Sequence, residues 1–123
     1  MAVTYTNAVK DARMGAVVTQ IGATGVLEIG TTGMASVLAT IALNSTAGTS
    51  SSGVLTFSGF PKSDTSADNT GTAAAARIRT ASGGTDIITG LTVGTSGADI
   101  ILDSVSITAG QTVTINSATI THA

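Results

Sequence analysis

The feature that most constrains the fold of this chain is a change of hydrophobic period at Gly22. After this residue, apolar and small polar residues alternate at every second position in short runs, for example in residues 54–59 and 74–79. Clusters of Gly, Ser, Asn and Asp separate these runs at about every 8–12 residues. Such a pattern is typical of antiparallel all-β domains. The sequence therefore predicts an all-β fold, an antiparallel β-sandwich of jelly-roll-like type with about eight short strands.

Individual segments refine this expectation. Residues 37–43 are apolar on both faces, which predicts a central strand. Residues 44–53 and 61–72 are rich in Ser, Thr, Asp and Gly, and we expect both to be loops. Strands around 74–79 and 87–93 are expected to form a hairpin, with a bulge at Gly90.

The last strand contains a defect in its alternation. Val113 and Ile115 have one phase, whereas Ala118 and Ile120 have the other. A regular strand cannot send both pairs to the same side of a sheet. We therefore expect a β-bulge or a bend between two sheets at Asn116–Ser117, with all four apolar residues buried.

One helical pattern precedes the strands, over residues 7–20. Thr6 or Asn7 can serve as the N-cap, and Gly22 stands where a left-handed C-cap belongs. The expected partner of the helix is a sheet end of the same domain, and a neighbouring subunit is the alternative. We expect one domain over residues 1–123, with an N-terminal arm and helix in 1–22 and the β-sandwich in 23–123. The predicted apolar face of the helix consists of Val9, Ala12, Ala16 and Val17.

The composition is unusual in its low charge. Charged residues make up 10% of the chain, against roughly 25% in a typical domain, and aromatic residues make up 2%. The five basic residues are scattered, which argues against nucleic-acid binding. Because charge normally keeps small proteins apart, such a surface suits a protein docked in an assembly. A free monomer with a small-polar surface is the open alternative.

No segment has the length and apolarity of a membrane helix, so we expect no membrane partner. The N-terminal residues do not resemble a cleaved signal peptide, which predicts synthesis in the cytoplasm. The chain has no cysteine, so thiol chemistry is excluded.

Few residues could carry catalysis or bind a metal, and we expect neither enzymatic activity nor a cofactor. His122 is the one histidine and lies next to the C-terminus, where residues are poorly held. Asp64, Asp68 and Asn69 could offer oxygen ligands to calcium, although a turn with Asx hydrogen bonds is the favoured interpretation. On a strand, Asp99 and Asp103 would lie about 13 Å apart, too far for a glycosidase pair.

Arg77 and Arg79 form the most notable charged pair. Their spacing places both side chains on one face of a strand. The favoured interpretation is a solvated face opposed by Asp86 or another acid across the hairpin. A docking patch for an acidic surface is the alternative.

The strand and turn signatures resemble those of a family of small phage and prophage virion proteins. The segments that carry this resemblance are residues 27–30, 36–44, 63–68, 71–79, 91–103 and 106–122. With the helix before them, these segments are spread over nearly the whole chain, and they are fold signatures without a site motif. The resemblance implies a virion component similar to the capsid decoration (cement) proteins of tailed phages.

This resemblance sets the functional expectations. We expect a structural protein, a homo-oligomer or a multi-copy lattice, that binds the major capsid protein on the outside of the head and stabilises it. A head–tail connector or tail protein is the first alternative, and a host-surface or glycan-binding module is the second. An enzyme is the least favoured class. The expected interface residues are Met1, Ala2, Val3, Thr4, Tyr5, Pro61, Lys62, Asp64, Asp68, Arg77 and Arg79.

Overall fold

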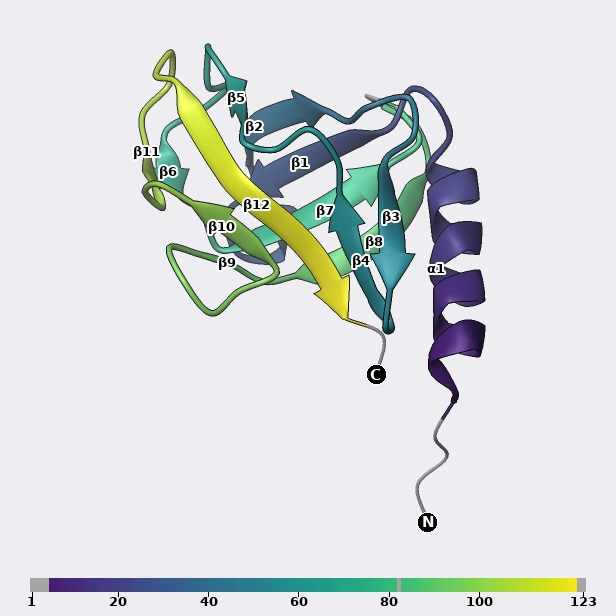
Figure 1. Ribbon diagram of the computed structural model, residues 1–123. Helices are drawn as coiled ribbons and strands as arrows, with labels where there is room; N and C mark the ends of the chain where they lie inside the picture. Colours follow the sequence, from purple (N-terminus) through teal and green to yellow (C-terminus); the bar gives the residue numbers. More distant parts are fainter. Residues whose placement is uncertain (1–4, 82, 122–123) are drawn as a thin grey trace.

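The computed structural model describes residues 5–81 and 83–121 of the chain (Figure 1). Within this part the protein is mostly β, with 44% strand and a single α-helix, α1 (Asn7–Ile21), and a short 3-10 turn η1 (Thr32–Met34). The strands are β1 (Val26–Gly30), β2 (Val37–Ala42), β3 (Gly48–Ser51), β4 (Val54–Phe57), β5 (Lys62–Asp64), β6 (Gly71–Thr72), β7 (Ala75–Arg79), β8 (Asp86–Leu91), β9 (Val93–Gly94), β10 (Ile100–Leu102), β11 (Ser106–Ile107) and β12 (Val113–Thr121).

Two main sheets pack face to face (Figure 1). The four-stranded sheet has the order β2-β1-β7-β8, and all its pairs are antiparallel. The prediction that residues 37–43 form a central strand is therefore wrong, because β2 is an edge strand whose outer edge is covered by the segment 64–69. The second sheet, called here the β12 sheet, has the order β3-β4-β12-β10-β9, and β5 also pairs with β12. Its one parallel pair is β9 with β10. A small sheet of β6 and β11 completes the described part.

The core lies between the two main sheets, as the alternation predicted. Inward-facing residues of the four-stranded sheet meet those of the β12 sheet in one apolar cluster. Its fully buried members include Leu27, Ile29, Ile41 and Ile78 from the former, and Leu55, Ile100, Leu102 and Ile115 from the latter.

More strands are present than the eight or so that were expected, because several are only two to four residues long. β3 lies within residues 44–53, and β5 and β6 lie within residues 61–72, segments that were expected to be loops. Their Gly, Ser and Thr residues show no apolar alternation. They are strands because their backbone pairs with the backbone of another strand. A local sequence pattern does not reveal such pairing.

Helix α1 begins and ends where its caps were predicted. The Thr6 hydroxyl accepts a hydrogen bond from the Val9 N–H, and Gly22 has a φ of 75° and donates to the Val18 carbonyl. The positive φ explains why glycine suits this position. The helix packs beside β3 and β4, on the sheets of its own chain (Figure 1).

The predicted apolar face of α1 is wrong at three of its four residues, and only Val17 packs against the core. Val9 is 43% exposed, and Ala12 and Ala16 are also exposed. The helix instead buries Met14 and Ile21, with Val17 and Val18 partly buried against the core. These four residues form a second stripe at helical spacing, and their longer side chains reach the sheets better than alanine does.

The final strand has the irregularity that its alternation predicted. In the pairing with β10, Ile101 lies opposite Ser117 and Leu102 opposite Ile115, so Asn116 is an extra residue. This bulge lets Val113, Ile115 and Ala118 all be buried, while Ile120 is partly buried against the core. Around it β12 changes partner, from β5 at residues 113–115 to β4 at residues 119–121.

Candidate functional site

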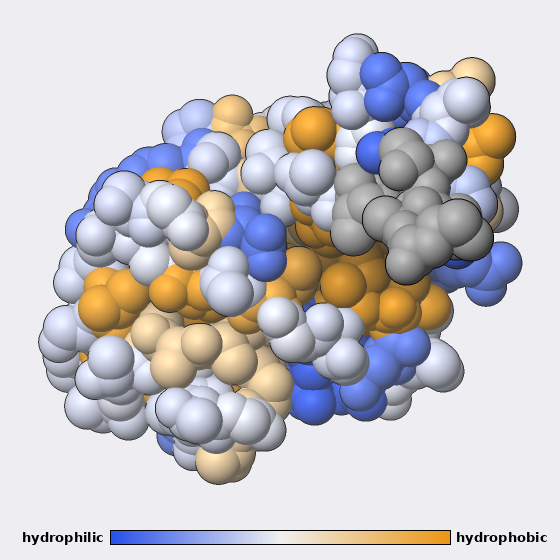
Figure 2. Space-filling model, turned by 90° about the horizontal axis from the view of Figure 1, so that it is seen from below, coloured by the Kyte–Doolittle hydropathy of each residue, from blue (hydrophilic) through white to orange (hydrophobic). Residues whose placement is uncertain are grey.

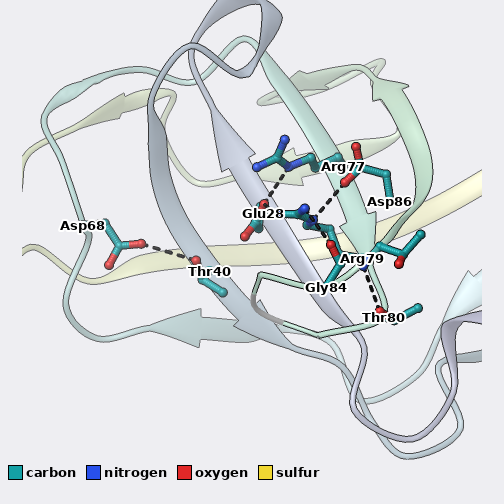
Figure 3. A network of polar contacts seen from close by, with 9 residues as sticks. Glu28, Thr40, Asp68, Arg77, Arg79, Thr80, Gly84 and Asp86 are labelled. Atoms are coloured by element: carbon teal, nitrogen blue, oxygen red, sulfur yellow. Dashed lines mark hydrogen bonds and ion pairs between the residues drawn. The ribbon is translucent and has the colours of Figure 1, made fainter.

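The most concentrated group of charges lies on the outer face of the four-stranded sheet (Figure 3). We call it the Glu28 cluster: Glu28 on β1, Arg77 and Arg79 on β7, and Asp86 on β8. Register alone brings them together, since Glu28 lies opposite Arg77, and Arg79 lies opposite Asp86. The predicted placement of both arginines on one face is confirmed, and the predicted acid across the hairpin is Asp86.

Glu28 is the centre of this cluster. Its carboxylate Oε1 lies 2.6 Å from Arg77 Nε and 3.9 Å from Arg79 Nη1, and its side chain is 7% exposed. Sequence reasoning placed Glu28 in a strand but assigned it no role. A carboxylate in the middle of the apolar run 26–29 was the available signal, because such a residue needs a cationic partner when it is buried.

Arg79 has a more crowded environment. Its Nη2 donates to the Gly84 carbonyl at 2.6 Å, and its Nε lies 2.8 Å from Asp86 Oδ1. The Nε–H is buried and is not aligned with that carboxylate as a hydrogen bond, so the contact is an ion pair only. With two acids and two bases the cluster is neutral as a whole.

Asp64 and Asp68 also lie together, and both bind the edge of β2. Asp64 Oδ2 accepts the Thr40 N–H at 3.0 Å, and Asp64 Oδ1 accepts the Ser66 N–H at 3.0 Å. Asp68 Oδ2 accepts the Thr40 hydroxyl at 3.3 Å. The Asx hydrogen bond within this loop is the turn that the sequence favoured. Within residues 5–81 and 83–121, no three His, Cys, Asp or Glu side chains come together as metal ligands would.

The remaining expected interface residues are dispersed. Tyr5 is 42% exposed, and its ring lies 4.8 Å from the Arg13 guanidinium carbon. Pro61 is exposed, while the ammonium group of Lys62 donates to Asn44 Oδ1 at 2.7 Å. Four of the predicted interface residues lie outside the described part of the chain, namely Met1, Ala2, Val3 and Thr4. His122 also lies outside it.

Asp99 and Asp103 flank β10 and serve separate contacts. Asp99 Oδ2 accepts both the N–H and the hydroxyl of Thr92, each at 3.1 Å. Asp103 Oδ1 accepts Asn116 Nδ2 at 2.8 Å. Asp99 therefore closes the loop between Thr92 and Asp99, whereas Asp103 joins the end of β10 to the bulged residue of β12.

An apolar band crosses the lower face of the molecule (Figure 2). The apolar residues that are only partly buried against the core include Val17 and Val18 on α1 and Ile87 and Ile88 on β8, two elements in contact with each other. No pocket is present on the surface formed by the described residues.

No protein-family model, curated protein or solved structure matches this chain. Among the described residues, no helix is both long and apolar enough to cross a membrane.

Proposed function

We propose that this chain is a structural subunit of a tailed-phage particle that binds the outside of the capsid and stabilises the head. As part of this proposal, the two sheets form the jelly-roll-like arrangement that was expected from the sequence. The resemblance of its strand and turn segments to small virion proteins names the class, and one observation on the described residues supports it.

That observation is that most of the few charged side chains have partners within the chain itself. All seven acidic side chains accept hydrogen bonds or ion pairs from the chain itself. Arg77 and Arg79 belong to the neutral Glu28 cluster, and Lys62 is bound to Asn44. The surface between them is left to Thr, Ser, Gly and Ala, which provide little repulsion between neighbouring molecules. Such a surface suits dense packing on a lattice.

A decoration protein needs only weak individual contacts. Many copies bind a repeating shell at once, so the array persists although each contact is modest. A stable interface needs roughly 800 Å² per partner. That is a minor part of the 6086 Å² surface of this chain, so one sheet face with the N-terminal segment can supply it. The proposed contacts are Met1 to Tyr5 and the segment 61–72.

Counting the copies in purified particles tests this proposal. A decoration protein is expected at hundreds of copies, and particles without it should assemble but release their DNA at a lower temperature. Removing residues 1–5 should weaken attachment and leave the melting temperature of the free protein unchanged, since the helix cap at Thr6 remains. About a dozen copies, the number of one symmetric ring, would indicate a connector instead. Absence from particles would contradict any virion role.

A further inference from the structure

The long edges of the two main sheets are not treated alike. The edge of β2 is covered by the segment 64–69 through three hydrogen bonds. The Asp68 N–H donates to the Leu38 carbonyl at 2.7 Å, Asp64 Oδ2 accepts the Thr40 N–H, and Asn69 Nδ2 donates to the Val37 carbonyl at 2.8 Å. Such covering prevents an edge from pairing with another chain.

The edge of β3 is covered in a different way. Helix α1 lies along it, and Asp11 joins the two elements. The Asp11 carbonyl accepts the Ser50 hydroxyl at 3.1 Å, and its carboxylate accepts the Gly53 N–H at 2.9 Å, just beyond the end of β3.

β8 contacts α1, but no hydrogen bond joins its outer edge to another segment of the described chain. Within the described part of the chain, its backbone pairs with β7 alone, and no loop or side chain donates to or accepts from its other edge. β8 also carries two extra residues relative to β7, one at Ile87 and one near Gly90, whose φ is 73°. A bulged residue is left out of the ladder with β7, so these positions keep backbone groups free, while the bulges also bend the edge and limit which strands can pair with it. Lys, Arg and Pro, the residues that usually block an edge, are missing from β8.

We propose that β8 pairs edge to edge with β8 of a second copy of this chain, antiparallel and about a twofold axis. An edge strand offers both donors and acceptors, so it complements itself in this arrangement. Charge favours the same orientation. Asp86 with its partner Arg79 lies at one end of β8, and residues 87–91 are uncharged. Antiparallel pairing keeps the two Asp86 carboxylates at opposite ends, whereas parallel pairing would place them side by side.

The apolar residues beside β8 supply the rest of the contact. A pair of six-residue strands alone buries less than the roughly 800 Å² per partner of a stable interface. Ile87 and Ile88 on β8, with Val17 and Val18 on the adjoining helix, are partly exposed apolar side chains near this edge. In a twofold pair, the outer β8 edge of each copy is paired with that of the other copy. No β8 edge is then left for a third copy, so the assembly closes at two copies.

The oligomeric state of the purified full chain tests the pairing, independently of any capsid. Light scattering coupled to size-exclusion chromatography should give a mass of two chains of 11.9 kDa, with dissociation on dilution. Thr89→Lys places a cation on the exposed side of the pairing strand and should yield monomers. Thr56→Lys is the matched control, since Thr56 is also exposed but lies on β4, which is paired on both edges. Monomers of the unsubstituted chain at high concentration, or equal effects of the two lysines, would overturn the proposal.

Cysteine crosslinking gives a second readout that does not depend on the lysine variants folding. The chain has no cysteine, so Thr89→Cys introduces a single thiol close to the twofold axis. Directly opposed residues of antiparallel strands have Cβ atoms about 4.5–5.5 Å apart, within reach of a disulfide after a small adjustment. Mild oxidation should crosslink Thr89→Cys as a dimer and leave Thr56→Cys mostly monomeric. Equal crosslinking of the two variants, or none in either, would show that β8 is not the contact.

Discussion

At Glu28 a single carboxylate lies between two guanidinium groups on a sheet face that points away from the core. Its side chain is 7% exposed, and those of Arg77 and Arg79 are 22% and 21% exposed. Without the carboxylate, two positive charges two residues apart on β7 would face each other with one acid, Asp86, remaining nearby. Breaking a buried pair leaves an uncompensated charge, which costs more than the pair itself contributes.

The first prediction is that Glu28→Ala lowers the free energy of unfolding by about 2 kcal/mol. This is below the usual cost for a fully buried pair, because water partly screens the arginines. Urea denaturation measures it, with Asp103→Asn as the control at an exposed carboxylate whose loss should stay within about 0.5 kcal/mol. Equal losses of unfolding free energy in the two variants would mean that water already screens the charges of the Glu28 cluster.

Whether the sequence predicts a contact in this cluster depends on the number of residues that separate the two partners along the chain. The shared face of Arg77 and Arg79 follows from strand geometry, since residues two apart point the same way. Their bond to Glu28 joins residues 49 positions apart and depends on β1 pairing with β7. No local pattern contains that pairing, so only the structure shows which acid the arginines bind.

The same distinction holds for whole elements. The bulge of β12 was predicted because a phase error between Ile115 and Ala118 is a property of the strand itself. The ends of α1 were predicted from Thr6 and Gly22 for the same reason. Its buried face was not, because α1 has two apolar stripes and the position of β3 decides which of them is buried. The short strands β3, β5 and β6 were missed because only their neighbours make them strands.

The segment 61–72 gives a prediction at the scale of an element. Asp64 accepts two backbone N–H groups at the partly buried edge of β2, whereas Asp68 accepts one exposed hydroxyl. Asp64→Ala should therefore lower the free energy of unfolding by about 1–3 kcal/mol, because the Thr40 N–H loses its partner. Asp68→Ala should change it by less than about 0.5 kcal/mol. Thermal melts of the two variants compare them directly, and a larger loss at Asp68 would contradict this account of the β2 edge.

For the molecule as a whole, internal use of charge links the fold to the proposed role. Carboxylates at edges, in loops and at the helix contact of Asp11 already accept hydrogen bonds within the chain, which reduces their attraction for a partner. What a partner meets is a surface of hydroxyl and methyl groups, together with the apolar band of Figure 2. Recognition by such a surface depends on shape and apolar burial more than on charge.

Salt dependence of attachment separates this view from the alternative in which Arg77 and Arg79 dock on an acidic capsid surface. Salt screens exposed charges beyond a Debye length of about 10 Å at 0.1 M and about 3 Å at 1 M, so charge-driven binding weakens steeply between these concentrations. Apolar burial does not weaken in this way. If the Glu28 cluster is neutral toward partners, the amount of protein retained on capsids should change by about twofold or less over that range. Arg77→Gln, compared with Arg13→Gln on the helix, provides the matched pair of variants. A steep loss with salt, abolished by Arg77→Gln alone, would show that the cluster itself contacts the capsid and that its neutrality is broken on binding.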